Sequence, residues 1–245
     1  MKLEEYLLVI EDFLKKYLED SHMDMYVLGL SGGVDSSLCA GLLKKAVGKD
    51  RFHCIMMPID SHPNDLNDAL EVAKALDINY TVLDLSETYH QFVDSFAKNG
   101  IELDLSSKIN LKVRLRMCAV YAYGQKHRGL VVGTDNMDER YTGYFTKYGD
   151  GAADILPITH LTKAEVVEAA KLVGVPKHLA ERTPSAGLFE GQTDEGEMGV
   201  TYEELDSYLL GGEINEVSKQ KIERLHRISE HKRNPIPECE PFKRG

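Results

Sequence analysis

The sequence contains no tryptophan and only four cysteines in 245 residues. These cysteines are widely spaced, and no two of them form a CxxC pair; they are Cys39, Cys54, Cys118 and Cys239. The spacing argues against a structural zinc site and against a disulfide framework. It favours a reducing compartment, and we expect the protein in the cytoplasm.

Long apolar segments are missing as well. No run approaches the roughly 18 consecutive apolar residues that a membrane-spanning helix needs. Charged residues such as Glu4, Glu11 and Lys15 interrupt the apolar positions at the start of the chain, which is unlike the apolar core of a signal peptide. We therefore expect a soluble protein without a membrane partner.

Positive charge is scarce, because the formal net charge is −11 at pH 7. Binding to a phosphate backbone relies on clustered Lys and Arg, so this charge argues against a nucleic-acid partner. Residues 231–245 are locally basic, which is typical of a solvated chain end. The chain is 42% hydrophobic and 28% charged, and at this length it can bury a full hydrophobic core.

Short apolar segments alternate with amphipathic segments along the first half of the chain. Apolar residues three and four positions apart predict a first helix over 3–18. Ser86 is expected to cap the helix that begins at residue 87. The predicted strands cover 25–30, 51–59, 78–85 and 129–134, and the helices that follow them cover 36–47, 64–76, 87–99 and 107–127.

These strands lack polar alternation, which indicates a doubly wound α/β fold: a parallel sheet with helices on both faces. In such sheets, ligands bind beyond the carboxyl ends of the strands. Two unusual loops follow the first and fourth strands, "SGGVDSS" at 31–37 and "GTDNMDER" at 133–140. We expect the two loops to meet at one site. No repeat or linker interrupts the chain, so we expect a single domain over 1–245.

The second half of the chain contains long loops and fewer helices. Residues 141–154 are rich in tyrosine and glycine and show no helix or strand period, and long loops of this kind are commonly functional. Thr162 and Glu165 form a capping-box pattern that begins another helix. A second glycine-rich loop covers 181–199, and two further helices are expected over 201–209 and 214–231.

The loop "SGGVDSS" has the chemistry of an anion site. Backbone N–H groups at a helix N-terminus and the helix dipole favour phosphate, and the two glycines allow close approach. Ser31 and Ser36 add hydroxyl donors. Asp35 would repel phosphate unless a divalent cation lies between them, so it predicts Mg²⁺. The alternative is that these residues only cap a helix, and the loop matches neither GxxxxGK[ST] nor GxGxxG.

The full string "SGGVDSS" after an apolar strand resembles the signature of the ATP pyrophosphatase superfamily. The resemblance implies an adenine nucleotide alpha hydrolase-like fold, and members of the superfamily cleave ATP between the α and β phosphates. The resemblance to ammonia-dependent NAD⁺ synthetases is closer and extends from about residue 3 to 237. It is carried, in order and spacing, by "NLKVRLRMCAVYA", "GLVVGTDNMDERYTGYFTKYGDGAADILPITHLTK", "TPSAGL", "QTDEGEMGVTYEELDSYL" and "HKRNPIP".

This resemblance implies a two-step reaction. The nicotinate carboxylate of deamido-NAD⁺ attacks the α-phosphorus of ATP, which releases pyrophosphate and forms an acyl-adenylate. Ammonia then attacks the carbonyl, which releases AMP and NAD⁺. The chain has no room for a glutaminase domain, so ammonia is free or comes from a separate subunit. The family also implies a homodimer and Mg²⁺ as the cofactor.

The resemblance assigns roles residue by residue. Asp35 and Glu139 are the expected metal ligands, and Asp35, Lys163 and Asp154 are the expected catalytic residues. The ATP-core segment is about 20–140, and the substrate loops and C-terminal helices follow over 141–245. The expected ATP-binding residues are Gly29, Leu30, Ser31, Gly32, Gly33, Val34, Asp35, Ser36, Thr134, Lys163 and Ser185. The expected deamido-NAD⁺ residues are Asn110, Arg114, Lys147, Asp154, His231 and Lys232.

Some positions depart from the family pattern or have simpler interpretations. Val34 stands where glutamine is common, residues 136–138 replace a histidine and two small residues, and Gly187 replaces an aspartate. Arg114 and Arg116 together are also compatible with a solvated helix face. Competing functions are a GMP synthetase-like amidotransferase, a tRNA-thiolating enzyme, which the cysteine spacing and charge oppose, and a non-catalytic adenine-nucleotide-binding module.

Overall fold

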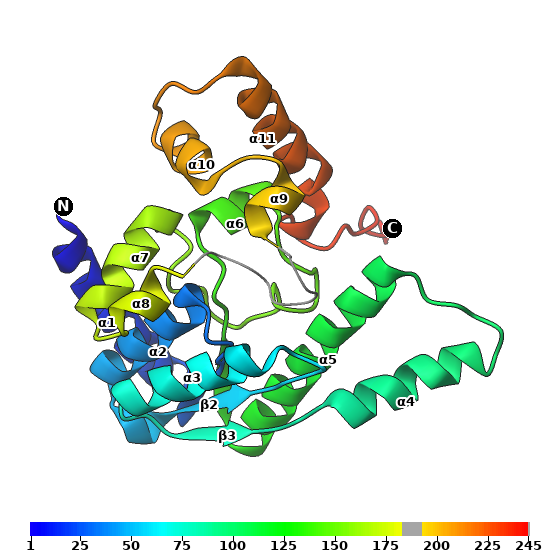
Figure 1. The fold of residues 1–245 in the computed structure, drawn as a ribbon, viewed down its shortest axis with the longest axis horizontal. Helices are drawn as coiled ribbons and strands as arrows, with labels where there is room; N and C mark the ends of the chain where they lie inside the picture. The colour runs from blue at the N-terminus through cyan, green and yellow to red at the C-terminus, as the bar shows by residue number, and fades with distance from the viewer. Residues whose placement is uncertain (183–192, 245) are drawn as a thin grey trace.

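The computed structural model describes residues 1–182 and 193–244. Within them, four parallel strands form one sheet in the order β3-β2-β1-β4 (Figure 1). Pairing places Leu28 opposite Cys54 on one side and Val132 on the other, so β1 is a central strand. The strands are β1 (Met25–Gly29), β2 (Phe52–Met56), β3 (Tyr80–Val82) and β4 (Gly129–Val132).

Helices cover both faces of the sheet, as expected. Tyr26 and Leu28 pack into the large core on one face of the sheet, whereas Val27 points to the other face and packs with Val120. This second face carries α5 (Leu105–Lys126), and α4 (Ser86–Ala97) packs against α5. The helices that contribute to the large core are α1 (Leu3–Asp20), α2 (Val34–Val47), α3 (Pro63–Ala75), α7 (Lys163–Leu172) and the short α8 (Lys177–Ala180).

The capping prediction for Ser86 is wrong. Ser86 is already helical, and Leu85 occupies the N-cap position. The Asp84 carboxylate accepts a hydrogen bond from the Ser86 backbone N–H at 2.8 Å, and the Ser86 hydroxyl instead accepts one from the Asp60 N–H. An aspartate two residues earlier therefore supplies the acceptor at this helix end.

The C-terminal part of the chain packs over the carboxyl end of the sheet (Figure 1). Its helices surround a small core of Met198, Val200, Tyr202, Leu205 and Ile222. Short helices appear where the sequence predicted loops, because local caps begin them: Asn136 and Glu139 form a capping box. The remaining elements are η1 (Lys49–Arg51), α6 (Met137–Thr142), α9 (Asp194–Met198), α10 (Tyr202–Leu209), α11 (Glu216–Ile228) and η2 (Glu230–Lys232).

None of the helices in the described part of the chain is both long enough and apolar enough to cross a membrane.

Candidate active site

The loop between β1 and α2 has the geometry of a close-approach turn. Gly32 lies in the left-handed region with φ of +85°, and a Cβ there would come within 2.9 Å of the α3 backbone. Only glycine fits this position. The Ser36 hydroxyl accepts a hydrogen bond from the Ser31 N–H at 3.3 Å and donates to the Gly33 carbonyl at 3.0 Å. The first N–H groups of α2 are thereby held at the mouth of the turn.

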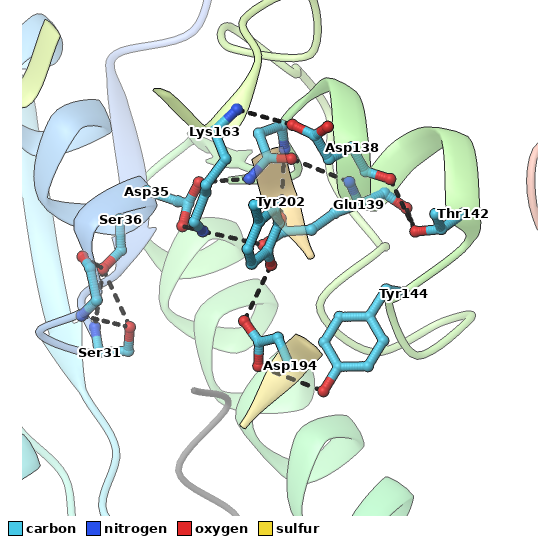
Figure 2. Close-up of polar contacts among 12 residues, drawn as sticks. Ser31, Asp35, Ser36, Asp138, Glu139, Thr142, Tyr144, Lys163, Asp194 and Tyr202 are labelled. Carbon is cyan, nitrogen blue, oxygen red and sulfur yellow. Dashed lines mark hydrogen bonds and ion pairs between the residues drawn. The ribbon is translucent and has the colours of Figure 1, made fainter. Parts of the chain in front are cut away.

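Three side chains predicted from separate segments meet beside this loop (Figure 2). Lys163 Nζ, in the first turn of α7, lies 2.6 Å from Asp35 Oδ2 in α2 and 3.4 Å from Glu139 Oε1 in α6. Asn136 donates its side-chain N–H to the other oxygen of Asp35 at 2.7 Å. The Lys163 residue is 4% exposed. The expected metal ligands and the phosphate lysine therefore form one cluster, in which Lys163 is buried and the two carboxylates are partly buried.

The charges of Asp35, Glu139 and Lys163 in this cluster depend on one another. Burial and the Asp35 carboxylate raise the pKa of Glu139 well above its usual range. Burial alone would lower the pKa of Lys163, but the two carboxylates outweigh it and raise that pKa. The ammonium group of Lys163 thus stands in for a cation between two oxygen donors, which is the donor set that Mg²⁺ prefers.

Two carboxylates alone do not supply the six ligands that Mg²⁺ prefers. No group of three or more His, Cys, Asp or Glu side chains capable of holding a metal occurs among residues 1–182 and 193–244. Mg²⁺ in nucleotide sites is commonly held by one or two carboxylates together with substrate phosphates and water. The pair Asp35 and Glu139 fits that mode of binding, in which ATP supplies the remaining ligands.

A cavity of about 310 Å³ opens beyond the carboxyl ends of the strands. Its walls include most of the predicted ATP residues and groups that the sequence did not indicate, notably Arg116, Asp135 and Asp150. The predicted residues on its wall are Gly29, Leu30, Ser31, Gly33, Val34, Asp35, Ser36, Thr134, Glu139 and Lys163. The two loops that the sequence placed at adjacent strand ends therefore share one cavity.

Helix α5 holds the segment that follows β2. Arg116 donates from Nε to the Met57 carbonyl at 3.0 Å and from an Nη to the Ser61 hydroxyl at 3.2 Å. Lys112 Nζ donates to the Ile59 carbonyl at 3.1 Å. Arg116 is thus part of the cavity wall rather than a solvated helix face. The sequence offered Arg114 and Arg116 only as a helix face, and the partners of Arg116 lie in the segment after β2, which no local pattern indicates.

The predicted substrate residues also lie near one another. Thr146 donates to the Asn110 side chain at 2.8 Å, and Arg114 donates to the Lys147 carbonyl at 3.3 Å. Lys147 Nζ then donates to the His231 carbonyl at 2.6 Å. Contacts from α5 through the long loop to the chain end thus join four of the predicted residues. Lys147 and His231 line a second cavity of about 410 Å³.

The other two predicted substrate residues, Lys232 and Asp154, contact backbone groups of separate segments. Lys232 Nζ donates to the Gly143 carbonyl at 2.7 Å and lies 5.2 Å from the centre of the Phe145 ring, so it braces the long loop. Asp154 Oδ2 accepts a hydrogen bond from the Val131 N–H at 2.7 Å and points at the edge of β4. The catalytic role of Asp154 stays a prediction. Ser185 and Gly187 lie outside the described residues.

A buried acidic pair supports the start of α7. Asp138 Oδ2 accepts the Lys163 backbone N–H at 2.7 Å, and Asp206 Oδ1 accepts it at 3.2 Å. Burial and the Asp206 carboxylate raise the pKa of Asp138 to about 8. At neutral pH the proton on Asp138 therefore relieves the repulsion between these two carboxyl groups.

This raised pKa predicts a pH-dependent effect of Asp138→Asn. The folded protein holds the Asp138 proton up to about pH 8, whereas the ordinary pKa is 3.8, so the wild-type residue lowers the free energy of unfolding as pH rises between these values. Asparagine keeps the acceptor oxygen and removes the titration. Urea unfolding without metal should show a stability gain for the variant that grows from about pH 5 to 8. A pH-independent difference would contradict the assignment.

The parallel sheet, the glycine–serine loop after β1 and the carboxylates at the strand ends define a nucleotide-binding α/β protein with the PP-loop fold. The family model for NAD synthase matches residues 6–236, and the chain belongs to this family. The NH₃-dependent NAD⁺ synthetase of Mesoplasma florum is 41% identical over all of both chains. That of Alkaliphilus metalliredigens is 46% identical over 92% of this chain and 94% of its own.

Solved structures similar to this chain include NAD synthetases and one NMN synthetase. The NMN synthetase of Francisella tularensis has a TM-score of 0.92 and 38% identity, covering 98% of this chain and 99% of its own. The NH₃-dependent NAD synthetase of Campylobacter jejuni has a TM-score of 0.79 and 28% identity, covering 98% and 100%. These likenesses confirm the predicted fold class and family.

Proposed function

We propose that this chain binds Mg·ATP in the 310 Å³ cavity, with Asp35 and Glu139 as the metal ligands and the 29–36 loop around the phosphates. The chain is a ligase that forms a C–N bond: it amidates deamido-NAD⁺ to NAD⁺ with ATP and ammonia. The observation that carries the site assignment is the buried Lys163 ammonium between two partly buried carboxylates. When bound, Mg²⁺ would neutralise phosphate charge and act as a Lewis acid.

The residues of the chain divide the remaining work. N–H groups at the start of α2 and the serine hydroxyls bind phosphate oxygens, and the helix dipole favours their negative charge. Lys163 turns from the carboxylates toward the phosphates and stabilises the charge on the departing pyrophosphate. The cavity wall holds the nicotinate carboxylate beside the α-phosphorus, and alignment of two bound substrates lowers the barrier. The ATP core over about 20–140 remains part of the proposal, with Lys163 contributed by the segment that follows it.

The acceptor binds beside the ATP cavity, where α5 and the long loop meet. The contacts among Asn110, Arg114, Lys147 and His231 support this placement, because they tie the cationic side chains of Arg114 and Lys147 to neighbouring segments. Of the four residues, Lys147 and His231 line the second cavity. A dinucleotide carries two phosphates that such groups can bind. Asp154 and Lys232 remain in the proposed substrate set through the family pattern.

A second acceptor is supported by one specific likeness. The solved structure with a TM-score of 0.92 is an NMN synthetase, whose product is a mononucleotide. The matching acceptor would be nicotinate mononucleotide. Steady-state rates with deamido-NAD⁺ and with this mononucleotide, at saturating ATP and ammonium, decide between the two. We expect kcat/KM to favour deamido-NAD⁺; a preference for the mononucleotide would establish the second acceptor instead.

We also expect a homodimer, in the cytoplasm. The hairpin of α4 and α5 extends from the body of the molecule (Figure 1), and it exposes Phe92, Ile101 and Leu105. Exposed apolar side chains on a projecting element are typical of a protein contact. Phe92→Glu should shift sedimentation velocity from dimer to monomer, whereas Lys98→Glu on the same hairpin should not. A wild-type monomer at micromolar concentration would contradict this proposal.

A further inference from the structure

Helix α10 contacts Lys163 at two points. The ring of Tyr202 lies under the ammonium group, with Nζ 4.9 Å from the ring centre (Figure 2). One turn later, Asp206 accepts hydrogen bonds from the backbone N–H groups of Lys163 and Ala164 at 3.2 and 3.1 Å. The helix thus contacts both ends of the same residue.

The backbone contact compensates for an unfavourable position. Lys163 is the first residue of α7, where N–H groups have no partner within the helix and the helix dipole disfavours a cation. The Thr162 hydroxyl accepts the Glu165 N–H, two positions beyond Lys163. Asp206 therefore supplies a negative charge, and both Asp206 and Asp138 supply acceptors that the local sequence of α7 does not contain.

The ring contact restricts a flexible side chain. Tyr202 is 6% exposed, and its hydroxyl donates to Asp194 Oδ2 at 3.0 Å. Asp194 Oδ1 accepts a further hydrogen bond from Tyr144 at 3.3 Å, so the ring is fixed at its outer edge (Figure 2). A lysine has four rotatable side-chain bonds, and a desolvated aromatic face attracts its ammonium group. The ring lies against Nζ, which also contacts Asp35 and Glu139 and borders the ATP cavity, so the ring limits how far Nζ moves when it turns to the phosphates.

We propose that Tyr202 is a positioning residue for Lys163, so that α10 sets where the ammonium group meets the ATP phosphates. The inference rests on the proposed function of Lys163. Tyr202 contacts no other cation in the described part of the chain. Its effect on the reaction should therefore pass through Lys163 and appear in the chemical step rather than in the binding of either substrate.

Three variants separate this role from a structural one. Tyr202→Leu should lower kcat for deamido-NAD⁺-dependent ATP–pyrophosphate exchange about tenfold, with little change in KM for ATP. Tyr202→Phe keeps the ring and loses the hydrogen bond to Asp194, so it should lose about threefold or less. Tyr208→Leu is the control, because it removes a ring from the same small core but not from Lys163. Thermal melting checks that the two leucine variants lose similar stability.

A double-mutant cycle gives the decisive outcome. In a Lys163→Met background, Tyr202→Leu should have no further effect on kcat, because the group that it positions is gone. Equal fold-losses in both backgrounds, or an equal kcat loss in Tyr208→Leu, would overturn the positioning role while leaving the function of Lys163 intact. Wild-type kcat in Lys163→Met alone would instead contradict the proposed function of Lys163, and with it this inference.

Discussion

Asp35→Asn is expected to lower the rate of ATP-dependent adenylation at least about 100-fold. Removal of one ligand charge weakens the binding of a cation that stabilises the transition state by several kcal/mol. Asparagine preserves the size of the side chain. Asn136 already donates to Asp35 at 2.7 Å, and an amide oxygen can still accept that hydrogen bond. The fold should therefore survive, and Mn²⁺ electron paramagnetic resonance in the presence of ATP should show weaker metal binding.

Glu139→Gln should give the same pair of effects, because Glu139 is the other carboxylate beside Lys163. Asp68→Asn is the matched control. Asp68, in α3, forms an ion pair with Arg182, which follows α8, and it is not one of the two proposed metal ligands. Its rate should stay within about twofold of wild type, because it is not proposed to contact metal or phosphate. Near-normal turnover and metal binding in both Asp35→Asn and Glu139→Gln would eliminate the metal assignment.

Lys163→Met is expected to change catalysis and metal binding in opposite directions. Loss of a charge that stabilises the departing pyrophosphate should reduce kcat by about 100- to 1,000-fold. Without ATP, the same change should strengthen Mn²⁺ binding, because the ammonium group no longer neutralises the carboxylates 2.6 and 3.4 Å away. A rise in free-enzyme metal affinity is a result that simple damage to the site would not produce.

The control for this change is Lys171→Met, on the same helix. Lys171 pairs with Glu168 and Glu181 at the surface, away from the cavity. It should leave kcat and Mn²⁺ affinity close to wild type. If Lys163→Met binds Mn²⁺ no more tightly than the wild-type protein, the ammonium group does not occupy the cation position, and the role assigned to Lys163 before ATP binds is wrong.

Local patterns predicted the sheet and the phosphate loop well. The strands lack polar alternation because both faces of the sheet are buried, and β1 is paired on both sides. The capping box at Thr162 and Glu165 is present at the start of α7. The left-handed conformation of Gly32 agrees with the close-approach turn that paired glycines indicated. Each of these features depends on residues that are near one another in sequence.

Long-range contacts could not be predicted in the same way. The ion pair of Lys163 with Asp35 joins residues 128 positions apart, and nothing in either local pattern specifies it. Family resemblance named both residues but not the ammonium position between the carboxylates. Arg116 and Tyr202 were missed as site residues because their roles depend on what their helices pack against. Asp154 was predicted for substrate, and its carboxylate contacts the edge of β4 instead of lining the described cavity.

The central claim is that the nicotinate carboxylate is adenylated before ammonia attacks, and oxygen tracing tests it most directly. Deamido-NAD⁺ labelled with ¹⁸O in its carboxylate is incubated with the protein, ATP, Mg²⁺ and ammonium. The products are identified, and their ¹⁸O content is measured, by mass spectrometry. The account predicts AMP, pyrophosphate and NAD⁺ in equal amounts, with one labelled oxygen in the phosphate of AMP. Unlabelled AMP, or ADP and inorganic phosphate as the products, would contradict it.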